Sequence, residues 1–264
     1  MLTNIFDHNT TGDRVATADA RESIRRRVLS SSRWIQTPNF ARCSDLDLRT
    51  IFDQYDNAVF AGSLRESLKA SNADPIPIVL SGRLRSAGGR TVRVTERRSQ
   101  RVKYRIEIAS SLLFENFRTP EESVDVVGIT CTDRLDALMR VMEHEMLHLA
   151  EFLAFGETNC AAKRFQKTAV RLFGHKAHKH SMITRRQRVL SSTSIRPGHR
   201  VRFQHDGEEL VGTVNRINSR ATVLVEHRGG QRYTDGRRYL KFYVPVNSLG
   251  VLDESLKSQR TPAR

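Results

Sequence analysis

The chain has 264 residues, 38% of them hydrophobic, and its 44 Lys and Arg outnumber its 29 Asp and Glu, which gives a formal net charge of +15 at pH 7. This length and apolar fraction are enough for one large domain or two small ones, which excludes a wholly disordered chain. The positive charge favours a polyanionic partner, first of all nucleic acid, and the alternative is ordinary solvated surface charge.

Targeting and redox signals favour an intracellular protein. The N-terminus shows no basic segment followed by an apolar run, and no stretch of about 18 apolar residues occurs, so neither secretion nor membrane spanning is expected. Three cysteines, Cys43, Cys131 and Cys160, are an odd and sparse set that suits a reducing compartment. The expected location is the cytoplasm, the nucleoid included.

The N-terminal third is expected to contain an arm and a helix. Residues 1–42 are polar and Arg-rich with little apolar periodicity, which predicts a loosely ordered arm. From Ser44 onward apolar residues recur at helical spacing, and Ser44 or Asp45 is a suitable N-cap. This pattern predicts an amphipathic helix that is interrupted or ends near Gly62.

A small sheet and two further helices are expected next. The β-prone stretches PIVLSGRL, TVRVT and KYRIEIA are separated by turn residues and predict a small antiparallel sheet. A long helix is expected to start at Thr132 or Asp133 and to end at Gly156. Another helix should run from about Asn159 until Gly174 stops it.

A second unit is expected after a polar linker at 184–194. Residues 195–252 alternate short β-prone segments with turns, which predicts a small SH3-like barrel of the Tudor or KOW kind. The tail, 253–264, is expected to be disordered. The residues expected to fill the barrel are Val201, Phe203, Val211, Val214, Ile217, Val223 and Val225.

The long helix carries the sequence HEMLH, which is typical of zinc peptidases. His144 and His148 lie on one helical face, so both imidazoles can bind one ion. Glu145 then lies beside the ion, where its carboxylate can transfer protons during hydrolysis. The alternative is a helix with two exposed histidines, but the apolar neighbours leave little exposed face.

A catalytic zinc ion usually has three protein ligands, so a third is needed. Cys160 is expected to open the next helix, where the helix N-terminus would lower the pKa of its thiol and favour the thiolate. A buried, inert cysteine is the alternative. The other candidates for this ligand are Glu151, His175, His178 and His180.

Two segments combine basic residues with β-prone patterns. Residues 83–105 contain nine Lys or Arg and one acidic residue, Glu96. Strand alternation is expected to gather several of the basic residues on one face of the sheet. The barrel segment interleaves basic with aromatic residues that could stack on bases. A solubilising surface is the alternative. The residues expected to contact nucleic acid, DNA rather than RNA, are Arg83, Arg85, Arg93, Lys103, Arg105, Arg237, Arg238 and Lys241.

The order and spacing of five segments resemble the SprT-like zinc metalloprotease family. The segments are IFDQYDNAVFAGSL, IVLSGRLRSAGG, YRIEIASSLL, the HEMLH helix and CAAKRFQKTAVRLFGH, spanning about residues 46–182. The resemblance implies a zincin-like α+β domain at 43–183, in which helices pack on a small antiparallel sheet. It also implies that His144 and His148 bind zinc and that Glu145 is the general base.

One departure from the family pattern concerns the third ligand. The family usually supplies it from a His-Gly pair shortly before an aromatic residue, whereas NCAAKR precedes Phe165 here. Cys160 lies close to the expected place, one residue further from Phe165. Either Cys160 replaces that ligand or the site is altered.

Family members related to the Spartan protease degrade proteins crosslinked to DNA. The resemblance therefore implies a zinc-dependent endopeptidase acting on proteins bound or crosslinked to nucleic acid, as in DNA-protein crosslink repair. One alternative is a non-catalytic nucleic-acid-binding protein with a structural or vestigial zinc site, which the missing His-Gly pair favours. Another is a regulator of transcription or translation that binds a protein partner through the barrel.

Overall fold

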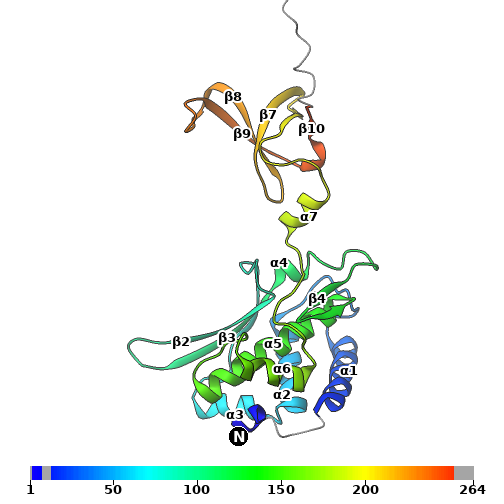
Figure 1. The fold of residues 1–264 in the computed structure, drawn as a ribbon, viewed down its shortest axis with the longest axis vertical. Coiled ribbons are helices and arrows are strands. Elements are labelled where there is room, and N and C mark those ends of the chain that lie inside the picture. Colours follow the sequence, from blue (N-terminus) through cyan, green and yellow to red (C-terminus); the bar gives the residue numbers. More distant parts are fainter. Residues whose placement is uncertain (1, 8–12, 253–264) are drawn as a thin grey trace, which may run out of the picture. The chain divides into compact units, whose positions relative to one another are not determined.

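The computed structural model describes residues 2–7 and 13–252. The fold is α+β, as predicted, and the chain divides into two compact units, Met1–Met182 and Ile183–Arg264 (Figure 1). The expected tail at 253–264 lies outside the described residues. None of the described helices combines the length and the apolar character needed to cross a membrane.

The first unit is mainly helical, and its helix ends follow local capping signals. Ser44 caps the second helix through a capping box with Asp47. Asp133 caps the long helix, and Gly156 ends it with a left-handed φ of +77°. The described helices of this unit are a 3-10 helix at Leu2–Phe6, α1 Asp13–Ser31, α2 Asp45–Val59, α3 Ser63–Ala70, α4 Ser110–Leu113, α5 Arg134–Phe155 and α6 Lys163–Phe173.

The main sheet of the first unit has three strands in the order β1-β3-β2. The strands are β1 Ile78–Ser81, β2 Gly89–Thr95 and β3 Val102–Ala109. Strands β2 and β3 form the expected antiparallel hairpin, but β1 pairs with β3 in parallel. The expectation of a wholly antiparallel sheet is therefore wrong for β1, because two chain reversals separate β1 from β3. A smaller antiparallel pair contains β4 Val124–Val126 and β5 Ile129–Cys131.

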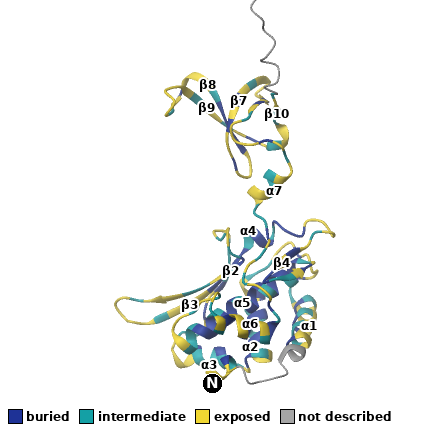
Figure 2. Ribbon diagram, in the orientation of Figure 1, coloured by how far each residue is buried: buried dark blue, intermediate teal, exposed yellow. Residues whose placement is uncertain are grey.

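Helix α5 lies at the centre of the first unit. It contacts α1, α2, α3 and α6 as well as strands β2, β3 and β4, and it is buried along most of its length (Figure 2). Its apolar residues, among them Leu138, Met142 and Leu149, are fully buried. The helix that carries HEMLH is therefore the core element of the unit.

The expectation of a loosely ordered arm at 1–42 is wrong for the described residues of that segment. Helix α1 contacts α2, α5 and α6, and its Ile24 and Val28 belong to the core. Ile35 and Phe40, which follow the helix, are also buried there. The helix escapes sequence analysis because it is mostly polar and only weakly amphipathic.

The second unit is an antiparallel sheet with strand order β10-β6-β7-β8-β9 and a hydrophobic core of its own. A short helix, α7 Arg185–Ser191, occupies most of the expected linker. The strands are β6 Arg200–His205, β7 Glu208–Ile217, β8 Ala221–Arg232, β9 Arg238–Val244 and β10 Gly250–Val251, with a 3-10 helix at Val246–Ser248. The SH3-like barrel stays a prediction.

The interior of this sheet largely follows the expected alternation. The expected core residues that are buried are Val201, Phe203, Val214, Ile217 and Val223, and Val225 is partly buried. The prediction that Val211 fills the interior is wrong, since 38% of this residue is exposed. Its partner across the sheet is Arg202, on the outer face. The inward position belongs to Gly212, where a Cβ would lie only 2.5 Å from the carbonyl oxygen of Leu224.

The first testable prediction concerns the attachment of α1 to α5. Glu143 of α5 is fully buried and accepts a hydrogen bond from the Arg21 Nε at 2.5 Å. Removing one partner of a buried ion pair leaves a buried charge poorly compensated. We expect Arg21→Ala to lower the free energy of unfolding by about 3 kcal/mol. Trp34, the single tryptophan, lies in this unit, so its fluorescence in a urea titration measures the change.

Arg26→Ala is the matched control on the same helix. The Arg26 side chain is 74% exposed and pairs only loosely with Glu22, at 3.9 Å. Its replacement should cost no more than about 0.5 kcal/mol. Equal effects of the two substitutions would show that α1 is not held by the Arg21–Glu143 pair.

Candidate metal centre

Three side chains that can bind a metal meet beside α5. His144 and His148 extend from the helix, and Cys160 lies in the turn that follows it; their ligand atoms all lie within 4.8 Å of one another. The two Nε2 atoms are 3.2 Å apart. Two nitrogens bound to a tetrahedral zinc ion at about 2.05 Å are separated by about 3.3 Å. The histidine pair therefore already has the spacing that zinc requires.

The ring of His148 is oriented by a hydrogen-bonded chain. Thr158 Oγ1 donates to Glu151 Oε2 at 2.7 Å and lies 2.6 Å from His148 Nδ1. Because the single hydroxyl proton of Thr158 goes to Glu151, Nδ1 of His148 must be the donor to Thr158. The Nε2 atom is then free of a proton and can bind a metal. Such outer contacts typically fix the tautomer of a metal-binding histidine.

Glu151, a candidate third ligand, is instead the last acceptor in this series of hydrogen bonds. It is fully buried, its Oε1 accepts from Arg164 Nε at 2.8 Å, and its Oε2 also accepts from the Asn159 backbone N–H. With both oxygens engaged, Glu151 supports His148 and does not join the cluster.

Burial keeps both histidines neutral. It lowers the pKa of His144 to about 2, with further lowering by His148, His175 and His178. Burial also lowers the pKa of His148 to about 4, although Glu151 acts in the opposite direction. Neutral imidazole is the form that binds a metal. His144 is held by packing against Phe165, with ring centroids 5.0 Å apart, and its buried Nδ1 has no hydrogen-bond partner among the described residues.

Cys160 joins the cluster, but not from a helix N-terminus as expected. Helix α6 begins at Lys163, with Ala162 as its N-cap. Burial raises the pKa of the Cys160 thiol, and the charges of Glu145 and Glu151 raise it further. In the described structure the helix therefore does not activate the thiol, so formation of the thiolate would depend on the metal itself.

Glu145 lies beside the histidine pair with its carboxylate tightly enclosed. It is 3% exposed, and Thr91 Oγ1 lies 2.9 Å from both its Oε2 and its backbone carbonyl oxygen. Burial raises its pKa to about 7, against the hydrogen bonds from Thr91. Gly89 permits this arrangement, because a Cβ at residue 89 would lie 2.7 Å from Glu145 Cγ.

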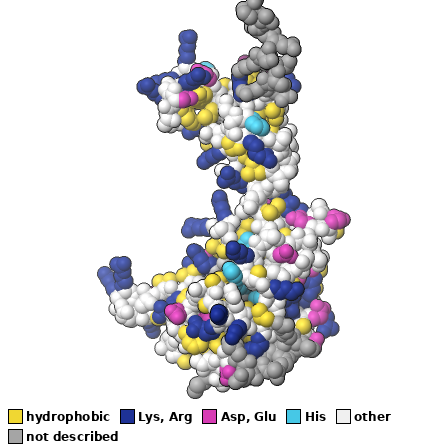
Figure 3. All heavy atoms as spheres, viewed as in Figure 1, with side chains coloured by type: hydrophobic (Ala, Val, Ile, Leu, Met, Phe, Trp, Pro, Cys, Tyr) yellow, Lys and Arg dark blue, Asp and Glu magenta, His cyan; other side chains and the backbone are white. Residues whose placement is uncertain are grey.

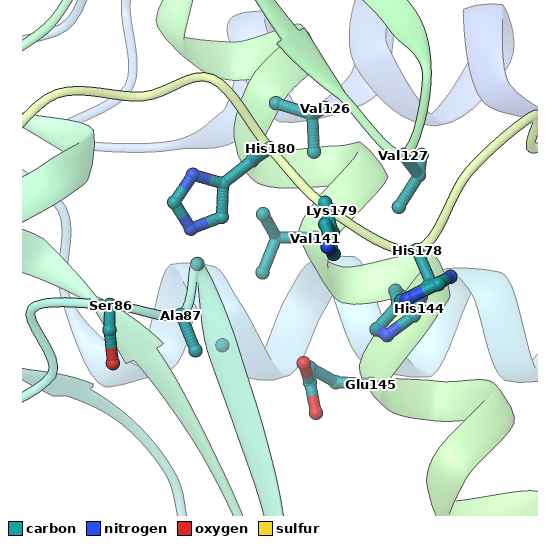
Figure 4. A pocket seen from close by; sticks show the side chains of 12 residues that line it. Ser86, Ala87, Val126, Val127, Val141, His144, Glu145, His178, Lys179 and His180 are labelled. Atoms are coloured by element: carbon teal, nitrogen blue, oxygen red, sulfur yellow. The ribbon is translucent and has the colours of Figure 1, made fainter. Parts of the chain in front are cut away.

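A cavity of about 300 Å³ opens beside these groups. Figure 4 shows His144 and Glu145 of α5 facing it, with His178 and His180 on the segment that crosses above them. That segment is fixed by a bridge between His180 and Val126 of β4. His178 and His180 therefore line the cavity without belonging to the three-residue cluster.

His175 has a separate role. It is buried, and its Nε2 lies 3.0 Å from Glu143 Oε2. Burial by itself would raise the pKa of Glu143, but the hydrogen bond with His175 and the charges of Arg21, His175 and Arg140 lower it to about 2. His175 thus binds the ionised Glu143 and is not a ligand of the cluster.

The basic residues of the hairpin are not gathered as expected. Arg93 pairs across the sheet with Tyr104, whereas Lys103 and Arg105 pair with Val94 and Val92, so Arg93 lies on the opposite face from Lys103 and Arg105. Arg83 and Arg85 lie in the exposed loop after β1, outside the strands.

The three basic residues expected in the second unit are exposed and make local contacts. Arg237 NH1 lies 3.3 Å from Glu226, and Arg238 donates to the carbonyl oxygen of Gly230. The Lys241 Nζ donates to Gln231 and lies 5.4 Å from the ring centre of Tyr233. Arg238 and Lys241 are three residues apart on β9, so they point to opposite faces.

Several supporting residues were missed by sequence analysis. Thr158 is close to Cys160 in the chain, and a hydroxyl so near a possible ligand was a usable signal. Thr91 and Gly89 lie on a strand more than 50 residues before Glu145. Only the packing of β2 against α5 reveals them.

The second testable prediction concerns Thr158. Thr158→Val keeps the shape of the side chain but removes the acceptor for His148 Nδ1. Loss of such a contact typically weakens metal binding by about 10- to 100-fold, and we expect this loss in a zinc competition titration. Thr130→Val, at an exposed threonine bonded to Asp125, is the control and should bind zinc like the wild type. Unchanged zinc affinity in Thr158→Val would refute the role of the hydrogen bonds that connect Glu151, Thr158 and His148.

Comparison of the chain with protein-family models, curated proteins and solved structures found no match. The likeness to the SprT-like family therefore depends on the five sequence segments alone. The geometry of His144, Glu145, His148 and Cys160 has to carry any functional conclusion.

Proposed function

We propose that the first unit is a zinc-dependent endopeptidase of the SprT-like type, which acts in the cytoplasm on proteins bound or crosslinked to nucleic acid. The observation that carries this proposal is that His144, a member of the cluster with His148 and Cys160, and the buried Glu145 line the same cavity. A proton-transferring carboxylate next to a metal-binding group and an open space is the arrangement that hydrolysis needs.

Each residue of the centre has a distinct task. His144, His148 and Cys160 would hold zinc, which when bound supplies a Lewis acid that polarises a peptide carbonyl and acidifies water. Glu145 accepts a proton from the attacking water and returns it to the leaving amine. Thr91 Oγ1 donates to Oε2 of that carboxylate and so holds it beside the cluster.

Strand β2 supports the choice of a peptide as substrate. It is an edge strand of the sheet. The Ala109 N–H donates to the Gly88 carbonyl oxygen, so the backbone groups of Gly88 face β3 and those of Gly89 and Thr91 face outward. An extended peptide could pair with this edge beside Glu145. A peptide paired with the edge of β2 would have its backbone next to the carboxylate that transfers the proton.

The charge of the chain supports a substrate on nucleic acid. The net charge of +15 favours binding to polyanions. Many of the basic side chains lie exposed on both units (Figure 3). We propose DNA as the nucleic acid.

A second candidate function is nucleic-acid binding with a structural zinc site. It is favoured by the position of His178 and His180, which line the same cavity as His144. A shift of one of them toward the cluster would give four protein ligands, and such closed sites are structural. In that case Glu145 would have no role in chemistry.

The third testable prediction separates these two functions. Glu145→Gln keeps the size of the side chain but cannot accept the proton. We expect the variant to bind zinc like the wild type and to lose at least about 100-fold in the rate of proteolysis of a DNA-bound protein, as loss of a general base typically costs. Zinc-dependent proteolysis at the wild-type rate in Glu145→Gln would refute the proposed function.

The fourth testable prediction concerns the space that Gly89 provides. In Gly89→Ala the new Cβ would lie 2.7 Å from Glu145 Cγ and 2.8 Å from Oε1, so the carboxylate must move. We expect kcat to fall by about 100-fold, the cost of a misplacement of about 1 Å, with zinc content unchanged. Gly82→Ala is the control, since its nearest contact would be an ordinary 3.9 Å to Ser110 Oγ. A Gly89→Ala enzyme with wild-type kcat would show that Glu145 need not occupy this position.

A further inference from the structure

The outer half of the β2–β3 hairpin extends beyond the packed part of the first unit (Figure 1). The strands stay paired up to Thr95 and Val102, and a hydrogen-bonded turn between Glu96 and Arg101 closes the hairpin. Residues 93–95 and 97–101 are exposed. Basic side chains gather at this tip (Figure 3). The hairpin is therefore a two-stranded ribbon with both faces free at its outer end.

Ion pairs divide the basic residues of the hairpin into two classes. Lys103 pairs with Glu96, and Arg105 pairs with Glu107 at 2.9 Å. By contrast, Arg97 and Arg98 at the turn are exposed, and none of the ion pairs within the described part of the hairpin includes them. Arg93 and Arg101 are not in these pairs either, and Arg90 and Arg105 share Glu107. Most of the uncompensated positive charge of the hairpin therefore lies toward its tip.

We propose that this tip binds in the major groove of double-stranded DNA, with Arg97 and Arg98 contacting the phosphates or base edges. The major groove of B-form DNA admits a two-stranded β-ribbon, and arginine contacts both phosphates and guanine edges. The major groove of A-form RNA is too deep and narrow for side chains to read. The shape of the ribbon therefore selects DNA over double-stranded RNA.

The same hairpin connects the tip to the candidate active site, and this step rests on the proposed function. Its inner end contains Thr91, which contacts Glu145. Arg97 is the sixth residue after Thr91, which corresponds to about 20 Å along a strand. DNA held at the tip would place the duplex roughly 20 Å from the cleaved peptide. The hairpin would act as a spacer that directs cleavage to proteins attached to the duplex and away from the DNA itself.

A binding experiment with two charge-matched variants tests the DNA contact. The full-length chain, Arg97→Gln/Arg98→Gln and Lys103→Gln/Arg105→Gln are titrated with a 30-base-pair DNA duplex at several salt concentrations, and circular dichroism verifies folding. Each variant loses two positive charges from the same hairpin. For the tip variant we expect the slope of log K against log salt to become shallower by about 1.8, since each lost phosphate contact contributes about 0.9. The Lys103 and Arg105 variant should keep the wild-type slope.

Two results would overturn the DNA contact. Equal loss in the two variants would show a diffuse electrostatic effect, and no loss in either would place the contact elsewhere. A duplex RNA of the same sequence is the second ligand, and it should bind more weakly than DNA without distinguishing the variants. Equal binding of both duplexes with the same loss at Arg97 and Arg98 would contradict insertion in the major groove.

The spacing is tested with a peptide tethered to the duplex through linkers of graded length. Deleting Val94, Thr95, Val102 and Lys103 removes two cross-strand pairs and shortens the ribbon by about 7 Å while keeping the pleat in phase. The linker length for fastest cleavage should decrease by a similar amount. An unchanged optimum would refute the spacer. If neither the wild type nor any variant cleaves the tethered peptide, the proposed function is wrong. The binding experiment still decides whether the tip contacts DNA.

Discussion

The structure of the first unit depends on one constraint: α5 is buried along most of its length and yet carries five polar side chains between Glu143 and Glu151. Glu143, Glu145 and Glu151 are almost wholly enclosed, and His144 and His148 are largely so. A buried polar group without partners costs more than a hydrogen bond returns. The elements around α5 must therefore supply partners for this row of side chains, as Arg21, Thr91 and Thr158 do.

These partners come from distant parts of the sequence. Arg21 of α1 and Tyr55 of α2 bind Glu143, while Thr91 of β2 binds Glu145. Such contacts explain why α1 belongs to the folded unit and why β2 approaches α5 closely enough to need glycine. They also fix the side chains that the chemistry uses, because each one is held by packing or by a second group. Stability and site geometry thus share the same contacts.

Local signals in the sequence predict the helices well and the long-range contacts poorly. The ends of α5 follow from Asp133 and Gly156, and HEMLH places His144 and His148 on one face whatever surrounds the helix. Helix α1 was missed because it is mostly polar and because Arg21 and Arg25 bind Glu143 and Asp133, more than 100 residues away, which no local pattern records. Val211 was misplaced because Gly212, with no side chain, occupies the inward position. The role of Cys160 depended on where α6 begins, and the structure starts that helix three residues later.

The central claim is that His144, His148 and Cys160 form an open zinc site beside Glu145. The most direct measurement is the zinc content of the purified protein and of Cys160→Ala, each followed by X-ray absorption at the zinc edge. We expect one zinc ion bound by two imidazoles, one sulfur and one light solvent oxygen, with the sulfur lost in Cys160→Ala. No zinc, or a shell closed by four protein ligands, would contradict it.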